Sequence, residues 1–239
     1  MKINEVITKE EQQKWNSHFA KDNQMSYPSE FVTRILLGNY PRVPFPKKFR
    51  GKKICDVGCG DGGNLPLLAR CGFETFGVEI SWEIVDAINH NLMRLGVAAK
   101  LAVGNNAALP FPDRHFDFLL SWNACYYMGE GRDFGAHVQE FARVLKPGGF
   151  MVLSVPKKTC FIYRGSKQLK LGYRIIKNDP ARIRNGHVLR QFSGEADIVK
   201  AFRPYFTNFV FASLESEFFG LDLHWHIVIV QNKDKLRGH

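Results

Sequence analysis

The sequence contains no apolar run that approaches the roughly twenty residues a membrane-spanning helix requires. Its first residues, MKINEVITKEEQQ, are polar and lack the apolar core of a secretory signal. The five cysteines are odd in number and form no C-x-x-C pair, which argues against a disulfide framework. Together these absences predict a cytoplasmic, reduced protein without a membrane span.

Metal ligands and repeats are also scarce. Cys55 and Cys59 are close in sequence, but Cys55 belongs to a predicted buried strand and no His or Cys cluster completes a metal site. No internal repeat or low-complexity segment is visible. We therefore expect no metal, and a chain of 239 residues is compatible with one α/β domain that buries a substantial core.

A glycine-dense turn follows the first predicted strand, in the segment ICDVGCGDGGN from Ile54 to Asn64. Its glycines satisfy both G-x-G-x-x-G and G-x-G-x-G spacings, which let backbone approach a nucleotide closely: Gly58, Gly60, Gly62 and Gly63. Asp56 lies two residues before the first of them. A carboxylate there disfavours a pyrophosphate and suits a cationic ligand with an amino group. The loop therefore favours S-adenosylmethionine over NAD.

A second acidic residue stands about twenty residues further on. The segment TFGVEI, Thr75 to Ile80, is a compact predicted strand that ends near Glu79. A carboxylate at the tip of the second strand of a nucleotide-binding fold can accept hydrogen bonds from both ribose hydroxyls. Glu79 is the predicted ribose contact.

With these motifs, the segment from Lys52 to Pro156 resembles the Rossmann-like S-adenosylmethionine-dependent methyltransferases, in particular their small-molecule branch. Two further stretches carry the resemblance: GNNAALPFPDRHFDFLLSWN, Gly104 to Asn123, and RVLKPGGFMVLSVP, Arg143 to Pro156. The resemblance implies a methyltransferase that uses S-adenosylmethionine and releases S-adenosylhomocysteine. It also implies a seven-stranded, mostly parallel α/β sheet with helices on both faces and an antiparallel C-terminal hairpin strand.

The resemblance extends to a set of cofactor-binding positions, with one departure. Members of the family commonly place an Asp where this chain has Asn105, and an amide oxygen can accept the same adenine hydrogen bond without charge assistance. The residues expected to bind the cofactor are Asp56, Gly58, Cys59, Gly60, Glu79, Ile80, Asn105, Asn106, Ala107, Ser121 and Asn123.

The pattern of apolar residues predicts alternating strands and helices. Ser81 and Asn64 are predicted helix caps, and Gly96 a helix end. Strands are expected at 53–57, 75–79, 99–103, 116–121 and 149–155, and helices at 64–71, 81–94 and 134–145. A helix at 194–203 and strands near 206–214 and 224–231 follow, the last two forming a hairpin with one antiparallel strand.

One methyltransferase domain, 1–239, is expected, in four parts. These are an N-terminal helical cap at 1–50, a cofactor-binding core at 52–156, a basic insertion or lid at 157–190, and a C-terminal helix and strands at 191–239. The cap should contain two helices separated at Tyr27-Pro28. Such leaders fold over the cofactor and substrate mouth in the family, which makes Tyr27 a candidate substrate contact; packing against the sheet is the alternative.

The basic insertion holds nearly all of the chain's excess charge. Residues 157–190 carry ten basic side chains and one acid, Asp179, for a net charge of +9 against +10 for the whole chain. Because like charges repel, we expect a substrate bearing phosphate or carboxylate to supply the counter-charge. Arg182 and Arg184 are the predicted gripping residues, since a guanidinium matches either anion bidentately. A solvated flap without a partner is the alternative.

The chemistry requires alignment for in-line displacement at the methyl group, and a general base only if the acceptor must lose a proton. No residue is assigned as catalytic. His187 is the best candidate, ahead of His137, expected on a helix surface, and of Tyr126 and Tyr127, both also candidate substrate contacts.

The segment SWNACYYM after the fourth strand lacks the Asn/Asp-Pro-Pro-aromatic motif of enzymes that methylate amino groups of nucleic-acid bases, and a Pro-Cys pair for attack on cytosine is also missing. The paired glutamates that grip an arginine are absent too. A small-molecule acceptor is therefore favoured. Two alternatives stay open: an RNA or tRNA methyltransferase that uses the basic segment, and a non-catalytic or NAD-dependent protein.

Overall fold

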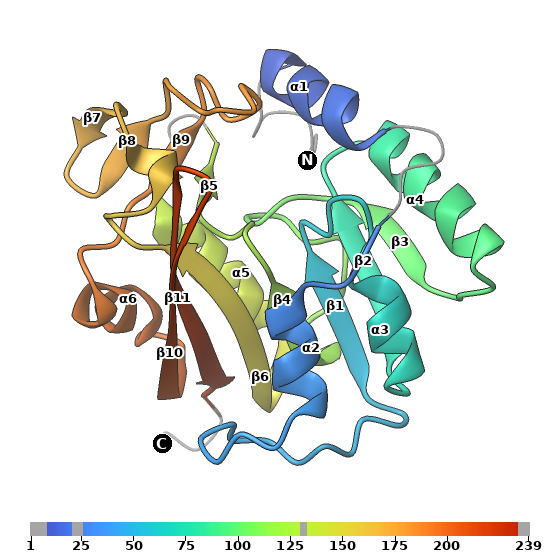
Figure 1. The fold of residues 1–239 in the computed structure, drawn as a ribbon. Helices are drawn as coiled ribbons and strands as arrows, with labels where there is room; N and C mark the ends of the chain where they lie inside the picture. Colours follow the sequence, from blue (N-terminus) through green and yellow to red (C-terminus); the bar gives the residue numbers. More distant parts are fainter. Residues whose placement is uncertain (1–8, 21–25, 130–132, 234–239) are drawn as a thin grey trace.

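The computed structural model describes residues 9–20, 26–129 and 133–233. A seven-stranded sheet runs through the molecule in the order β10-β11-β6-β4-β1-β2-β3 (Figure 1). The bounds along that order are β10 (Phe206–Phe218), β11 (Leu221–Asn232), β6 (Leu145–Pro156), β4 (Phe116–Ser121), β1 (Lys53–Val57), β2 (Glu74–Glu79) and β3 (Lys100–Val103). The predicted core strands are confirmed, most within a residue or two of their bounds, although β6 begins four residues early.

Strand directions in this sheet follow the prediction. β1 runs parallel to β2 and β4, and the parallel set continues to β3 and β6. β11 pairs antiparallel with both β6 and β10, so it is the one reversed strand of this sheet within the described ranges. A mostly parallel sheet with an antiparallel C-terminal hairpin strand is therefore confirmed.

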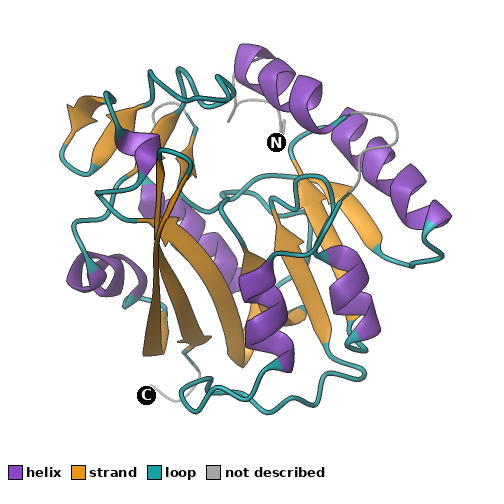
Figure 2. Ribbon diagram, in the orientation of Figure 1, coloured by secondary structure: helices purple, strands orange, loops and turns teal. Residues whose placement is uncertain are grey.

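Helices cover both faces of the sheet (Figure 2). One face packs against α2 (Glu30–Leu37), α3 (Leu65–Arg70) and α4 (Trp82–Arg94), and the other against α5 (Phe134–Val144) and α6 (Glu195–Phe202). β4 shows why, because it buries apolar side chains on both of its faces. Phe118 and Leu120 join the α2 side and Leu119 the α5 side. Phe116 also joins the α5 side, since the strand is irregular between Phe116 and Phe118. None of the helices in the described ranges is long and apolar enough to cross a bilayer.

The helix caps are partly as predicted. The Ser81 hydroxyl accepts a hydrogen bond from the Ile84 backbone N–H and so caps α4. The expectation that Asn64 caps α3 is wrong. Its side chain instead donates to Asp56 Oδ2 at 3.2 Å and accepts from the Ser29 backbone N–H at 3.0 Å. Asn64 therefore joins the end of β1 to the start of α2.

The two helices expected in the N-terminal cap are present as α1 (Lys9–Phe19) and α2. α1 buries no residue completely and lies above the carboxyl ends of the strands, next to α4 (Figure 1). A 2.6 Å hydrogen bond from the Ser81 hydroxyl to Asn16 Oδ1 fixes it there. The first eight residues of the polar N-terminus lie outside the described part of the chain.

The basic insertion is a folded unit. Its strands β7 (Lys167–Lys170), β8 (Tyr173–Ile175) and β9 (Val188–Arg190) form an antiparallel sheet with β5 (Tyr127–Met128), preceded by a 3-10 turn, η2 (Phe161–Tyr163). Tyr163 and Leu189 are buried in the same core as α5. The sheet stands at the carboxyl end of β4, beside the edge of the cofactor-binding core (Figure 1).

Loss of the Phe141 ring on α5 should destabilise the fold severely, because the side chain is fully buried among β4, β6 and α6 residues. We expect Phe141→Ala to lower the free energy of unfolding by about 3–5 kcal/mol in urea denaturation. The matched control is Phe219→Ala, whose ring is 91% exposed and should change stability by less than about 0.5 kcal/mol. Equal losses in the two variants would contradict this packing.

Candidate active site

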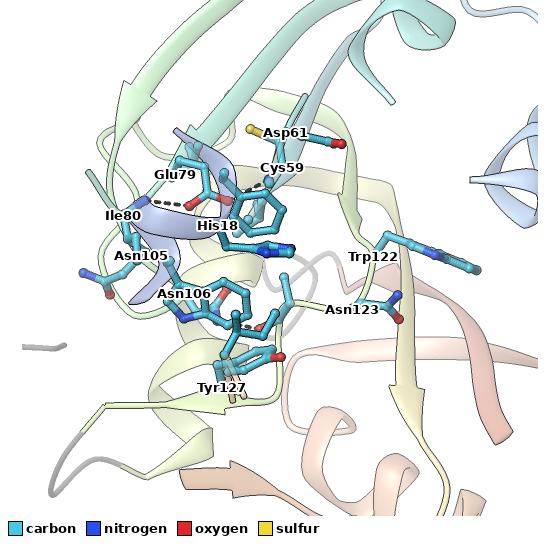
Figure 3. Close-up of a pocket in the computed structure, with 18 of the residues that line it drawn as sticks. His18, Cys59, Asp61, Glu79, Ile80, Asn105, Asn106, Trp122, Asn123 and Tyr127 are labelled. Carbon is cyan, nitrogen blue, oxygen red and sulfur yellow. Dashed lines mark hydrogen bonds between the residues drawn. The ribbon is translucent and has the colours of Figure 1, made fainter. Parts of the chain in front are cut away.

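A cavity of about 430 Å³ lies at the carboxyl ends of β1, β2 and β4, beneath α1 (Figure 3). This is the edge at which open parallel sheets bind ligands. Three groups of residues line it: the glycine loop after β1, the turns after β2, β3 and β4, and an outer wall from α1 and the basic insertion.

The glycine loop is built so that its backbone forms the cavity floor. Gly58 and Gly60 have left-handed φ angles of 70° and 62°, which side-chain-bearing residues adopt at a cost. A Cβ added at Gly58 would lie 2.5 Å from the Ala124 Cβ, so no side chain fits between the loop and the turn after β4. The backbone N–H groups of Gly58 and Cys59 both donate to the Val78 carbonyl, which ties the loop to β2.

Glu79 lies at the tip of β2 with its carboxylate held by main-chain donors (Figure 3). Oε1 accepts from the Gly60 N–H at 2.7 Å and Oε2 from the Ile80 N–H at 2.9 Å. Each oxygen retains a second lone pair, so the two oxygens together can still accept hydrogen bonds from both ribose hydroxyls. Burial raises the pKa of Glu79 to about 7, against the opposing effect of those two hydrogen bonds.

Asp56 stands behind the loop and does not line the cavity. Its Oδ2 accepts from Asn64, whereas its Oδ1 is buried without a hydrogen-bond partner among the residues that the structure describes. Burial raises the pKa of Asp56 to about 7, with the nearby Glu79 carboxylate adding to the effect. One buried carboxyl group in the cavity wall, Glu79, and a second behind it, Asp56, favour a cationic ligand, whose charge would stabilise both of them in ionised form.

The turns after β3 and β4 supply amide side chains (Figure 3). Asn105 lines the cavity, but its Oδ1 accepts from the Ala107 backbone N–H at 2.9 Å, so only the second lone pair can serve an adenine amino group. Asn106 donates to the Ala124 carbonyl at 3.0 Å. Asn123, at a positive φ of 59°, is held by the Ser154 hydroxyl.

Most of the expected cofactor contacts come together at this cavity. Eight of them line it: Gly58, Cys59, Gly60, Glu79, Ile80, Asn105, Asn106 and Asn123. Three do not: Asp56, Ala107 and Ser121. Ser121 is fully buried, and its hydroxyl donates to the Val57 carbonyl at 3.4 Å, so it braces β4 against β1.

Helix α1 forms a cavity wall that the sequence analysis did not identify residue by residue. It contributes Glu11, Trp15, His18 and Phe19, while the expected Tyr27 lies in the lining with 69% exposure. The rings of Trp15 and Phe19 stack with centroids 5.5 Å apart. Their spacing of four residues, in a segment that is otherwise polar, was the one available signal for an apolar face.

The structure brings some of the predicted substrate contacts of the insertion to the cavity. Arg184 and His187 line it, as does Tyr127. Arg182 is exposed and stands outside the lining, so its predicted role as an anion grip gains no support from this arrangement. Tyr126 is 1% exposed, a core residue rather than a wall residue.

The charge argument for the insertion also needs correction. The Arg184 guanidinium is bound to Asp179 at 2.7 Å and donates to the Tyr127 hydroxyl at 3.0 Å, so it has an internal counter-charge. Other basic residues of the insertion are paired as well. The ion pairs are Lys157–Glu215, Arg164–Asp222, Arg184–Asp179 and Arg190–Asp197. For these four, the protein itself supplies the anion that was expected from the substrate.

The two candidate histidines lie in different environments. His137 was expected on a helix surface and is instead 1% exposed, with Nδ1 3.0 Å from the Cys125 carbonyl oxygen. α5 is therefore turned so that this imidazole reaches the cavity lining. His187 is 4% exposed and lies 3.4 Å from Glu11 of α1.

A family model described as a methyltransferase domain matches residues 54–149, which hold the glycine loop, Glu79 and the asparagine turn. Residues 54–149 therefore match a methyltransferase domain, and the chain shares its fold with solved S-adenosylmethionine-dependent methyltransferases. The resemblance noted in the sequence is thereby confirmed. S-adenosylmethionine is the expected cofactor, and the buried carboxyl groups of Asp56 and Glu79 fit such a cation.

Curated relatives match a part of the chain. A 2-methyl-6-phytyl-1,4-hydroquinone methyltransferase of Synechocystis is 39% identical over 105 residues, covering 44% of this chain and 32% of that protein. A fatty-acid O-methyltransferase of Mycolicibacterium smegmatis is 30% identical over 147 residues, covering 57% and 50%. The methyltransferase chain thus spans about a third to a half of the length of these relatives.

Solved structures share the fold. A methyltransferase of Methanosarcina mazei superposes with a TM-score of 0.61 at 20% identity, covering 82% of this chain and 98% of that one. The 1,6-didemethyltoxoflavin-N1-methyltransferase of Burkholderia thailandensis, determined with S-adenosylhomocysteine bound, gives a TM-score of 0.57 at 17% identity, covering 77% and 72%.

Replacing Glu79 with Gln should weaken S-adenosylmethionine binding at least about tenfold, because it removes a charged acceptor for the ribose hydroxyls. Glu74→Gln on the same strand is the control, since that side chain faces solvent and pairs with Lys100. In the unchanged protein, affinity should fall as the pH drops through about 7, where Glu79 and Asp56 become protonated. Calorimetry between pH 6 and 8 measures both effects. Unchanged affinity in folded Glu79→Gln would remove this residue from the site.

Proposed function

We propose that this protein transfers the methyl group of S-adenosylmethionine to a small, largely apolar acceptor that is attacked through an acidic oxygen. The supporting observation is the mixed lining of the cavity beneath α1. It combines the buried carboxyl group of Glu79 and the amides of Asn105 and Asn106 with apolar side chains. The aromatic and aliphatic members of the lining include Trp15, Phe19, Trp122, Tyr127, Met128 and Ile183.

The protein's part in this reaction is to align the reacting groups and to exclude water from them. The bound cofactor supplies a sulfonium-activated methyl group that is open to in-line displacement. The Trp15 and Phe19 rings of α1 close the cavity from above, and Tyr127 and His187 bound it from the insertion. Holding two reactants at attack distance can contribute several kcal/mol to the rate, and exclusion of water strengthens each polar contact inside.

The relatives' names support an apolar acceptor. They act on a phytyl hydroquinone and on a fatty acid, which both join a long hydrocarbon part to an acidic oxygen. A phosphate-bearing acceptor has less support, because Arg184 is already paired with Asp179 and Arg182 lies outside the cavity. We therefore propose that the acceptor's anionic character resides in the reacting oxygen.

The main argument for an RNA or tRNA acceptor, the positive charge of the basic insertion, is weaker in this structure. The expectation rested on an unbalanced basic segment, and four of its ten basic side chains are neutralised by carboxylates of the protein. The cavity is also lined in part by α1 side chains such as Trp15 and Phe19, and four of the basic residues that could contact a phosphate backbone are already paired.

A test of this function uses cofactor with a trideuterated methyl group and three probes: a short-chain prenyl hydroquinone, dodecanoic acid and bulk tRNA. Mass spectrometry should find the labelled methyl group in at least one of the two apolar probes, and Glu79→Gln should lose this product. Label in the tRNA alone, or cofactor binding without transfer to either apolar probe, would contradict the proposal.

A further inference from the structure

Two residues from distant parts of the chain meet in the cavity wall, beside the rings of Trp15 and Tyr127. Glu11 belongs to α1, and His187 immediately precedes β9 of the insertion. The His187 Nδ1 atom lies 3.4 Å from Glu11 Oε1. The other ring nitrogen, Nε2, is buried and has no hydrogen-bond partner in the described part of the chain. A buried imidazole therefore faces a carboxylate on one side and lacks a donor on the other.

The ring is held in this orientation by its surroundings. Trp15 of α1 packs 5.5 Å from it between ring centroids, and Tyr127 of β5 makes an edge contact at 5.8 Å. The Lys14 ammonium donates to the Asn185 carbonyl at 3.1 Å, which joins α1 directly to the insertion. Glu11 can thus reach His187 only while α1 is docked on the cavity.

Burial keeps His187 neutral near pH 7, because it lowers the pKa of the imidazole below its ordinary value. The charged groups around the ring act in both directions. Glu11 and Asp179 favour the imidazolium, whereas Lys14 and Arg184 oppose it. A neutral imidazole carries one proton, and a carboxylate beside Nδ1 draws that proton to Nδ1, so that the lone pair is left on Nε2.

We propose that Glu11 is a positioning residue that holds His187 with its proton on Nδ1, and that His187 Nε2 is the general base for an acceptor hydroxyl. The inference rests on the proposed methyl transfer and narrows it. Of the acceptor oxygens considered, a phenolic or hydroquinone hydroxyl needs its proton removed, whereas a carboxylate is already ionised at neutral pH. The acceptor class is therefore a hydroxylated aromatic ring, and the base is complete only with α1 in place.

The step balances without a further reagent. The hydroxyl proton passes to His187 Nε2 as the oxygen's electron pair forms the bond to the methyl carbon. The carbon–sulfur bond breaks, its electrons remain on sulfur, and the sulfonium charge is lost. The imidazolium that results is stabilised by Glu11, and its proton returns to solvent after the product leaves. The 3.4 Å separation of His187 from Glu11 is a contact of the kind that tightens when such a charge forms.

The pair can be tested without any acceptor by NMR of protein labelled with ¹⁵N-histidine, with His187→Gln identifying the signal among eight histidines. His187 should show the Nδ1–H tautomer, and Glu11→Gln should lower its pKa further, because an opposite charge is lost. Glu10→Gln is the matched control on the same helix, since Glu10 is exposed and pairs with Lys14. An Nε2–H tautomer, or equal shifts in the two variants, would overturn the proposal.

A second measurement separates this role from the general function. His187→Gln should bind S-adenosylmethionine as the unchanged protein does, but methylate the prenyl hydroquinone at least tenfold more slowly, with the loss greatest at low pH. Any methylation of dodecanoic acid should fall by less, because a carboxylate has no proton to be removed. Equal losses on the two probes would refute the assignment of His187 as the base and leave the methyltransferase proposal intact. If the unchanged protein does not bind S-adenosylmethionine, the methyltransferase proposal itself is refuted.

Discussion

The arrangement of this molecule depends on one buried carboxylate, that of Glu79, which accepts hydrogen bonds from two backbone N–H groups. One donor, Gly60, belongs to the glycine loop after β1, and the other, Ile80, follows β2. The carboxylate therefore fixes the loop against the sheet edge and sets the shape of the cavity floor. Because burial raises its pKa to about 7, the same group is poised to gain from a bound cation. The position of the glycine loop and the preference for a cationic cofactor both follow from this one buried carboxylate.

The rest of the site is added by segments far from this core in sequence. α1 closes the cavity with Trp15 and Phe19, and the insertion supplies Tyr127's neighbours Arg184 and His187. Internal ion pairs hold four of the insertion's ten basic side chains, so these four need no anion from a ligand. Aromatic side chains and a buried carboxylate around one cavity would accommodate both the proposed apolar acceptor and a cationic cofactor.

Local sequence patterns predicted the core well because they act over short distances. The nearly continuous apolar run of β4 and the Ser81 cap of α4 are fixed by neighbours within a few positions. The outer wall was harder to predict, since the contact of Glu11 with His187 joins segments that are far apart in the sequence. The charge error had the same origin: Arg164 and Lys157 find their acids in β10 and β11, far along the chain. Net charge in a segment says nothing about such partners.

The central claim is that the cavity beneath α1 holds S-adenosylmethionine with its ribose on Glu79 and its reactive end toward the aromatic wall. A crystal structure with S-adenosylhomocysteine tests this most directly. The ribose hydroxyls should lie within hydrogen-bond distance of the Glu79 carboxylate, and the sulfur should face the space bounded by Trp15, Tyr127 and His187. A ligand bound elsewhere, or one whose ribose leaves Glu79 bonded only to Gly60 and Ile80, would contradict the account.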